Sequence, residues 1–461
     1  MNKADTIAAI STPLGEGGIG IVRLSGPDAY RITLELFECI RSTEMSFPEP
    51  RRLYHGYIRN QEGLRIDEVL TAFMPAPHTY TREDVVEINC HSGIMTLRII
   101  LKLALESGAR LAEPGEYTKR AFINGRIDLS QAEAVMNIVR ARSEEAVQVA
   151  SRALQGELTD KIEQIRDDLL AARAPLEAWF DYPDEHEEGA PGKDQIKAEL
   201  EQLQKKVSEI LQGVERNRAY QEGVSVAIIG KPNVGKSSLL NALLRQQRAI
   251  VHELPGTTRD MLEGFMSLGG YPIRLVDTAG IQGTDDPVEK EGIERSRLAA
   301  NQARMLIMVI DGSTPLDEAD NEITMLRKQN QGLVIVVNKK DLEKRVPLED
   351  LEKIHEDAEI IETAAIKGEG ISLLEDAVTR QLDTLLGSNS ESPAIVSLRH
   401  EEILTETLKY IDSAMLALET HPLELVSLEL QNAWNKLGEI TGETVSEALL
   451  DKIFSEFCLG K

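Results

Sequence analysis

The sequence predicts a multidomain protein, in which an α+β domain is followed by an α-helical domain that carries an inserted α/β domain. Three observations predict this fold class. Residues 1–125 mix short strand-like runs with turn residues. From about residue 223, apolar runs alternate with helical stretches, as in a mainly parallel sheet wrapped by helices. On both sides of that region, at 126–222 and 385–461, apolar residues recur at helical spacing.

Length, composition and charge limit the class of protein. The chain of 461 residues is too long for a single hydrophobic core, and 42% of its residues are hydrophobic. We therefore expect about two to four globular domains. The 51 lysines and arginines against 77 acids give a net charge of −26, which repels nucleic-acid phosphates unless basic residues gather locally. Cys39, Cys90 and Cys458 lack CxxC spacing, which argues against a disulfide framework or a zinc site. No apolar run approaches the roughly 20 residues that span a bilayer, so we expect a cytoplasmic protein without membrane contact.

The first two regions differ in their periodicity. Residues 20–24 and 85–89 alternate like strands, as an α+β domain requires. From Ser130 to about Trp179 the pattern is helical, and Ser130 with Glu133 has the form of a capping box at a helix start. A long helical region is therefore predicted to follow the first domain.

A second helical stripe follows the break at residues 181–194. Its apolar members recur three or four positions apart and predict one amphipathic helix in a bundle: Ile196, Leu200, Leu203, Val207, Ile210, Leu211 and Val214. Five apolar runs that each end in a loop come next, namely VSVAIIG, IRLVDTAG, MLIMVIDG, LVIVVNKKD and AEIIETAA. Helical spacing then returns, so we expect the two helical segments to pack together around an inserted domain.

Four short motifs in the inserted region predict a nucleotide site. They are GKPNVGKS at 230–237, GTTRD at 256–260, DTAG at 277–280 and NKKD at 338–341. Glycines in the first let backbone N–H groups close around phosphates at a helix N-terminus, where Lys236 reaches the β and γ phosphates. Ser237 and Thr258 are placed to bind Mg²⁺. Asp277 can hold the metal through water, and the Gly280 N–H can contact the γ-phosphate.

Asn338 and Asp341 select guanine, because an aspartate accepts both N–H groups of its Watson–Crick edge and finds no such donor pair on adenine. The sequence therefore predicts a P-loop GTPase (G) domain. Nucleotide contacts are expected from Asn233, Val234, Gly235, Lys236, Ser237, Ser238, Thr257, Thr258, Asp277, Thr278, Ala279, Gly280, Asn338, Lys339 and Asp341. A backbone N–H within residues 363–365 is expected at guanine O6. Ile281 stands where Ras-like GTPases carry the glutamine that orients the attacking water, so another group must do this.

Taken together, these motifs and the terminal CLGK resemble the MnmE (TrmE) family of tRNA-modification GTPases. The resemblance extends to the amino-terminal part through TPLGEGGIGIVRLSG, EDVVEINCHSG, PGEYTKRAF and NGRIDLSQAEA. It implies a folate-binding, dimer-forming domain at 1–125, a discontinuous helical domain at 126–222 and 385–461, and a G domain at 223–384.

The resemblance also implies a reaction. Family members act as a homodimer with the flavoprotein MnmG (GidA), in a heterotetramer or larger complex. They place an aminomethyl-type (carboxymethylaminomethyl) group on C5 of the wobble uridine of certain tRNAs. A 5-formyl- or methylene-tetrahydrofolate is the implied one-carbon source.

Particular residues follow from the same resemblance. A K⁺ ion is implied at Asn233 and Thr257 and at the carbonyls of His252 and Leu254, and Glu289 would position the attacking water when two G domains meet. Such a cation can neutralise developing charge where other GTPases use an arginine finger. The implied folate contacts are Arg23, Glu87, Arg126 and Lys461. Arg126 stands where a lysine is common, so its geometry can differ.

Alternatives remain for the function of the chain and for the role of Cys458. The chain could instead be a ribosome-assembly switch GTPase that does no chemistry on RNA, or a metabolic folate enzyme with a passenger GTPase. An assembly factor, however, would carry a basic RNA-binding module, for which this acidic sequence gives no sign. Cys458 could be a thiolate nucleophile, with Lys461 nearby, or a buried apolar filler.

Overall fold

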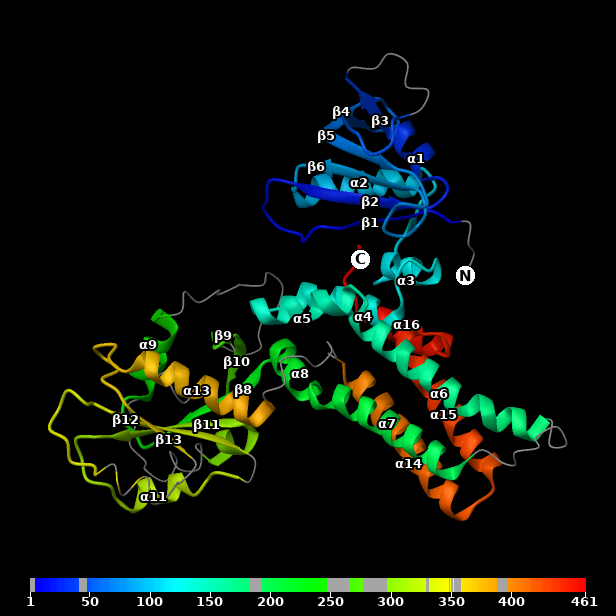
Figure 1. The fold of residues 1–461 in the computed structure, drawn as a ribbon. Coiled ribbons are helices and arrows are strands. Elements are labelled where there is room, and N and C mark those ends of the chain that lie inside the picture. Colours follow the sequence, from blue (N-terminus) through cyan, green and yellow to red (C-terminus); the bar gives the residue numbers. More distant parts are fainter. Residues whose placement is uncertain are drawn as a thin grey trace. The chain divides into compact units, whose positions relative to one another are not determined.

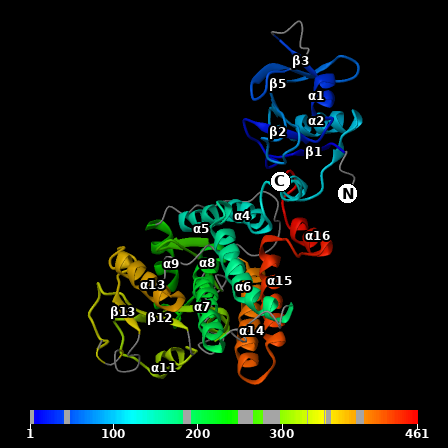
Figure 2. The same cartoon turned by 45° about the vertical axis from the view of Figure 1, so that its right-hand side comes forward.

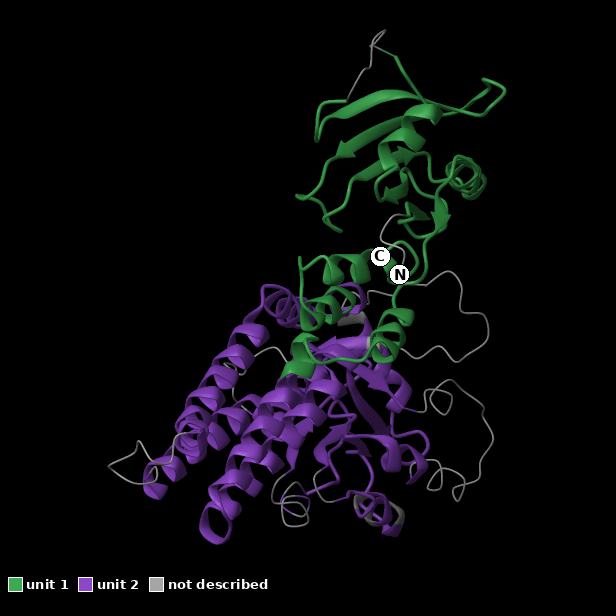
Figure 3. Ribbon diagram, turned by 90° about the vertical axis from the view of Figure 1, so that its right-hand side faces the viewer, with its two compact units in different colours: residues 1–136, 438–461 green, residues 137–437 purple. Residues whose placement is uncertain are grey.

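The computed structural model describes residues 5–40, 48–181, 192–246, 265–276, 297–328, 331–347, 349, 351, 358–387 and 397–461. The chain forms two compact units (Figure 3). One consists of residues 1–136 and 438–461, and the other of residues 137–437. The predicted domain limits at residues 125, 222 and 384 are not the limits of these units, so they stay predictions.

The first unit is built on a seven-stranded sheet of order β3-β4-β5-β6-β2-β1-β7 (Figure 1). Its strands are β1 (Ile7–Ile10), β2 (Gly20–Ser25), β3 (Phe37–Cys39), β4 (Leu53–Arg59), β5 (Arg65–Met74), β6 (Val85–Cys90) and β7 (Arg110–Leu111). All neighbouring strands are antiparallel except β1 and β7. The two strand-like runs of the sequence are β2 and β6, and their register places Arg23 opposite Glu87.

Helices complete the first unit. Helices α1 (Ala29–Leu36) and α2 (Ile94–Glu106) bury Ile32, Leu97 and Ile100 in one apolar cluster with the sheet. Helix α3 (Glu116–Ile123) and the last helix, α16 (Glu447–Ser455), are joined by an ion pair between Lys119 and Asp451. The end of the chain therefore folds against α3, within the first unit.

Six helices, which lie wholly or mainly in the second unit, pair the two helical segments of the sequence. They are α5 (Glu144–Leu154), α6 (Glu157–Asp181), α7 (Lys193–Gln212), α8 (Val214–Glu222), α14 (Leu398–Thr420) and α15 (Leu423–Thr441). Helix α14 packs along α7 (Figure 2), where Gln204 donates a 2.7 Å hydrogen bond to Asp412. Because α7 precedes the inserted domain and α14 follows it, the prediction of one discontinuous helical domain is confirmed.

The second sheet has the order β13-β12-β11-β8-β10-β9. Its strands are β8 (Val224–Ile229), β9 (Phe265–Leu268), β10 (Tyr271–Leu275), β11 (Met305–Asp311), β12 (Gly332–Asn338) and β13 (Glu359–Glu362). Five of them are parallel, and β9 alone pairs antiparallel, with β10. Strand β9 has no counterpart among the predicted apolar runs, because its four residues, FMSL, are too few to show an alternation.

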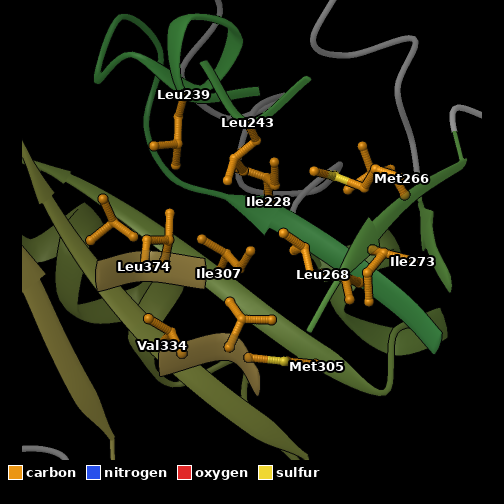
Figure 4. Close-up of a cluster of buried hydrophobic side chains, with 14 of the residues drawn as sticks. Ile228, Leu239, Leu243, Met266, Leu268, Ile273, Met305, Ile307, Val334 and Leu374 are labelled. Atoms are coloured by element: carbon orange, nitrogen blue, oxygen red, sulfur yellow. The ribbon is translucent and has the colours of Figure 1, made fainter. Parts of the chain in front are cut away.

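Both faces of this sheet are buried. Along β11, Ile307 enters one apolar cluster while its neighbours Leu306 and Met308 enter another. Figure 4 shows the first cluster, in which Leu239 of α9 (Lys236–Gln246) and Leu374 of α13 (Ile371–Leu386) cover the sheet. The second cluster lies over the opposite face, which α11 (Glu318–Thr324) helps to cover. Burial on both faces explains why β11 and β12 are continuous apolar runs.

The start of α4 (Leu129–Arg140) corrects one prediction. The capping box is formed by Asp128 and Gln131, not by Ser130 and Glu133. The Asp128 carboxylate accepts from the Gln131 N–H at 2.9 Å, and the Gln131 side chain accepts from the Asp128 N–H at 3.0 Å. Ser130 lies inside the helix, where its hydroxyl donates to Asp128 at 2.7 Å. None of the helices in the described ranges has an apolar stretch long enough to cross a membrane.

Candidate functional site

The phosphate-binding loop lies between β8 and α9. Its glycines adopt conformations that a side chain would oppose: φ is +148° at Gly230 and +103° at Gly235. A Cβ atom at Gly235 would lie 2.2 Å from the Asn338 side-chain nitrogen. The loop therefore needs glycine both for its backbone and for the close approach of NKKD. Helix α9 begins at Lys236, so its first N–H groups face the position expected for the phosphates.

Lys236 is folded into this loop. Its ammonium group donates to the carbonyls of Gly230 at 2.7 Å and Lys231 at 2.8 Å. Burial lowers the pKa of Lys236 below its usual value. A phosphate would stabilise the cation in the same place, because it supplies negative charge at low solvent exposure.

Asn338 connects three parts of the site. Its side-chain nitrogen donates to the Val234 carbonyl at 2.9 Å, which joins β12 to the phosphate loop. Its oxygen accepts from the Thr363 hydroxyl and the Ala365 N–H, both at 3.1 Å. Asn338 is buried, so each of these bonds replaces one that water would otherwise make.

The N–H groups expected at guanine O6 all have acceptors within the protein. Thr363 donates to the Val337 carbonyl, Ala364 to the Glu369 carbonyl and Ala365 to Asn338. Of the three, only Ala365 is held by a side chain of the nucleotide motifs. Its bond is therefore the one of the three that is not part of backbone pairing.

Two charged residues that no motif indicates, Asp311 and Lys367, contact NKKD. Lys339 donates to the Asp311 carboxylate at 2.5 Å, and Asp341 forms an ion pair of 3.3 Å with Lys367. Burial raises the pKa of Asp311, but hydrogen bonds from Lys339 and Ser313 outweigh it and hold that pKa below its usual value. The position of Asp311 at the end of β11 was the available signal, since carboxyl ends of parallel strands meet at one edge.

Several predicted residues lie outside the described part of the chain. These are His252, Leu254, Thr257, Thr258, Asp277, Thr278, Ala279, Gly280 and Glu289. Their roles stay predictions. Asn233, Ser237 and Ser238 are described, and Asn233 is an exposed residue with φ of +64° between the two glycines.

A second group of predicted residues meets in the first unit. A cavity of about 230 Å³ is lined by Arg23, Met74, Tyr80, Val85, Glu87, Val135 and Lys461. Arg23 binds Glu87 with two nitrogens at 2.8 and 2.9 Å, and donates to the Gly460 carbonyl at 3.4 Å. Burial, aided by the charge of Arg23, lowers the pKa of Lys461, although Cys458 opposes this. The last residue of the chain thus lies beside residues of β2 and β6.

Arg126 and Cys458 are near this cavity but do not line it. The Arg126 guanidinium lies over the Tyr80 ring, 4.7 Å from its centroid, and donates to the Tyr80 carbonyl at 3.1 Å. Cys458 is exposed, so its interpretation as a buried filler is wrong. Its carbonyl accepts from the N–H groups of Gly115 and Lys461, at 3.4 and 3.3 Å.

Comparisons with known proteins cover nearly the whole chain. Residues 6–126 match the family described as the GTP-binding protein TrmE N-terminus, and residues 129–458 match the MnmE helical domain. The tRNA modification GTPase MnmE of Bacillus velezensis is 42% identical over 459 residues, which are 99% of this chain and 100% of the relative. That of Clostridioides difficile is 43% identical over 458 residues, 99% of each chain.

Among solved structures, the G domain of the T. maritima FeoB iron transporter is 28% identical, with a TM-score of 0.25 over 34% of this chain and 98% of its own. The predicted family and the predicted GTPase activity are confirmed by the full-length relatives. The chain therefore belongs to the MnmE (TrmE) family of tRNA modification GTPases.

Proposed function

We propose that this chain hydrolyses GTP to drive the addition of a carboxymethylaminomethyl-type group to C5 of the wobble uridine in certain tRNAs. The observation that carries the proposal is the cavity of the first unit. It brings Lys461 of the terminal CLGK to Arg23 and Glu87, and Arg23 bonds to Gly460, which is 437 residues away in sequence. The family match favours this function over the ribosome-assembly switch.

The cavity residues fit a reduced folate, which would supply the one-carbon unit when bound. Glu87 can accept paired hydrogen bonds from an aminopyrimidine edge, and Arg23 already holds that carboxylate in place. Burial disfavours the positive charge of Lys461. An anionic or carbonyl group of the ligand would therefore stabilise the charged form. Arg126, stacked on Tyr80, is the remaining member of the proposed folate site.

The G domain would use two metal ions. Ser237 and Thr258 would hold Mg²⁺, and Asn233, Thr257 and the carbonyls of His252 and Leu254 would hold K⁺. Asn233 suits a cation, because its exposed amide makes no hydrogen bond to another described residue. Glu289 would position the attacking water when the G domains of a homodimer meet. Hydrolysis would then be coupled to that K⁺-dependent contact.

The proposed partner is the flavoprotein MnmG (GidA), in a heterotetramer or larger complex with the homodimer. The net charge of −26 supports a division of labour, since much of the basic surface for tRNA would then belong to the partner. The proposed domain limits are 1–125, 126–222, 223–384 and 385–461. Cys458 is proposed as a reactive thiol, because it is exposed three positions from the end of the chain.

Nucleoside mass spectrometry of tRNA tests this function. Cells that lack the chain are expected to lose a C5-modified uridine, and the wild-type chain is expected to restore it. Cys458→Ser should fail to restore it, whereas Cys39→Ser, at a half-buried cysteine of β3, should succeed. An unchanged nucleoside profile in the deletion would reject the proposed function. Restoration by Cys458→Ser would reject only the role of the thiol.

A further inference from the structure

One wall of the folate-site cavity is the loop between β5 and β6. Met74 and Val85 are paired at the base of this hairpin, and both line the cavity. Tyr80, in the middle of the loop, lines it as well. The other residues of the loop, 75–79 and 81–84, connect these three lining residues.

Three exposed arginines surround this loop. Arg51 donates to the His78 carbonyl at 3.2 Å, and Arg126 donates to the Tyr80 carbonyl two residues further on. Arg82, within the loop, donates to the Asn124 carbonyl at 2.9 Å and so lies beside the segment that leads to Arg126. We call Arg51, Arg82 and Arg126 the arginine rim.

The arginine rim carries charge that the described protein does not neutralise. None of its three guanidinium groups forms an ion pair with a residue in the described ranges, although acids outnumber bases in the chain by 77 to 51. The carboxylates of the loop are engaged elsewhere. Glu83 binds Arg120 and the Ser25 hydroxyl, and Asp84 accepts from the Ala76 N–H.

Most of the donors of the rim remain available to a ligand. A guanidinium has five N–H donors in a planar fork, and each rim guanidinium donates one hydrogen bond within the described ranges, to a backbone carbonyl. Such forks bind carboxylates and phosphates in paired hydrogen bonds. A flexible polyanion that begins at the cavity could therefore follow the rim.

The size of the cavity indicates which polyanion this is. Pockets that enclose a drug-sized ligand have about 300–1,000 Å³, so one of about 230 Å³ takes only part of a folate. The pterin end carries the groups that Glu87 can recognise, which leaves the aminobenzoyl-glutamate end outside. Cellular folates extend this end by glutamates joined through γ-carboxyl groups, and each one adds a carboxylate.

We propose that the arginine rim binds the γ-linked polyglutamate tail of a folate whose pterin end occupies the cavity. The inference rests on the proposed folate function, and it adds Arg51 and Arg82 to the ligand contacts. An exposed arginine–carboxylate pair changes affinity by roughly 1.5- to 5-fold. A triglutamate that reaches the rim is therefore expected to bind up to about tenfold more tightly than a monoglutamate, and the gain should shrink at high salt.

Equilibrium dialysis of the intact chain with 5-formyltetrahydrofolate tests this inference. The monoglutamate and the triglutamate are compared at low and high salt for the wild type, Arg51→Gln, Arg82→Gln and the double variant. The double variant should bind the monoglutamate like the wild type but lose the preference for the triglutamate. Arg82→Lys should keep part of that preference. Arg59→Gln is the matched control, since Arg59 is exposed on β4 and has no ion pair in the described ranges.

The outcomes separate the two proposals. If neither folate binds, the proposed folate function fails. If both bind equally to the wild type, or if the preference survives in the double variant, the folate function stands and this inference is wrong. If the triglutamate shows no preference while the double variant loses tRNA in a filter-binding assay, the rim binds RNA phosphates instead of the folate tail.

Discussion

At the scale of single residues, Asn338 shows how one side chain aligns separate motifs. It bonds to the phosphate loop at Val234 and to the β13 exit at Thr363 and Ala365. Val234 and Asn338 are more than 100 residues apart in sequence. One buried amide nevertheless holds the phosphate loop and the β13 exit at fixed distances from NKKD. A base bound by NKKD is therefore placed relative to phosphates bound by the loop.

Asn233 gives a testable prediction at this scale. Its φ of +64° lies in the left-handed region, which asparagine tolerates and alanine does not, so glycine is the substitution without backbone strain. Asn233→Gly should hydrolyse GTP at nearly the same rate in K⁺ and Na⁺ at equal ionic strength. The wild type should be at least tenfold faster in K⁺, because a fixed cation stabilises the developing charge.

The control for Asn233→Gly is its affinity for GDP, which should stay within about threefold of the wild type because the backbone of the loop is kept. A wild-type rate that is the same in both salts would contradict the proposed K⁺ site. A variant that keeps the full preference for K⁺ would show that Asn233 is not a ligand of that ion.

The motifs allowed a nucleotide site to be predicted residue by residue, because their spacing encodes contacts with a ligand of fixed shape, and the nucleotide contacts themselves stay predictions. Lys236 and Asn338 are examples, since both lie where the motif order implies. Asp311 and Lys367 were not predicted. Asp311 contacts NKKD from the end of β11 and Lys367 from the segment after β13, and such pairings arise only when strands align in the folded sheet.

At the scale of elements, the β9–β10 hairpin connects two of the nucleotide motifs. Strand β9 follows the segment that contains GTTRD, and β10 leads into DTAG. The closed end of the hairpin lies against helices: Tyr271 stacks on Tyr220 of α8, with centroids 4.5 Å apart and planes 5° apart. The Tyr271 hydroxyl donates to Asp383 of α13 at 2.8 Å. The hairpin is thus fixed at the end away from the nucleotide motifs.

Two substitutions separate the contribution of the Tyr271 hydroxyl to stability from that of its ring. Tyr271→Phe keeps the buried ring and removes the bond to a charged group, which should cost about 1–3 kcal/mol of unfolding free energy. Tyr271→Ala also removes the ring and should cost about 3–5 kcal/mol. Urea unfolding followed by tryptophan fluorescence measures both, because Trp179 and Trp434 belong to the second unit. Equal midpoints for the wild type and Tyr271→Phe would show that the hydroxyl contributes nothing.

The limits of elements were less predictable than their existence. The stripe from Ile196 to Val214 was predicted to be one helix, but α7 ends at Gln212 and α8 begins at Val214, so the last member of the stripe belongs to the next helix. The sequence is compatible with a capping box at Asp128 or at Ser130, and tertiary packing selects one of them. In the structure the N-cap of α4 is Asp128. Local propensity therefore predicts that a helix exists but leaves its first residue open.

At the scale of the whole molecule, the chain closes on itself within the first unit. Gly460 has φ of +88°, and a Cβ atom there would lie 2.4 Å from the Ile10 carbonyl oxygen. Arg23 holds the Gly460 carbonyl at 3.4 Å, and Lys461 then enters the cavity. Periodicity carries no information on such a contact between chain ends, so only the family resemblance placed Lys461 beside Arg23 before the fold was known.

This closure predicts that Gly460→Ala releases the terminal residues. Alanine would add a steric conflict with Ile10 to the left-handed strain, so Lys461 should leave the cavity. Carboxypeptidase B, which removes a terminal lysine only when it is accessible, should release Lys461 at least tenfold faster from Gly460→Ala than from the wild type, as followed by intact mass. Gly63→Ala is the matched control: Gly63 has φ of +83° but open space around it, so that variant suffers only the strain of roughly 1–2 kcal/mol. If both variants lose Lys461 at the wild-type rate, the packing of Gly460 against Ile10 does not hold the tail. Faster release from Gly460→Ala alone would show that a single backbone contact keeps the last residue beside Arg23.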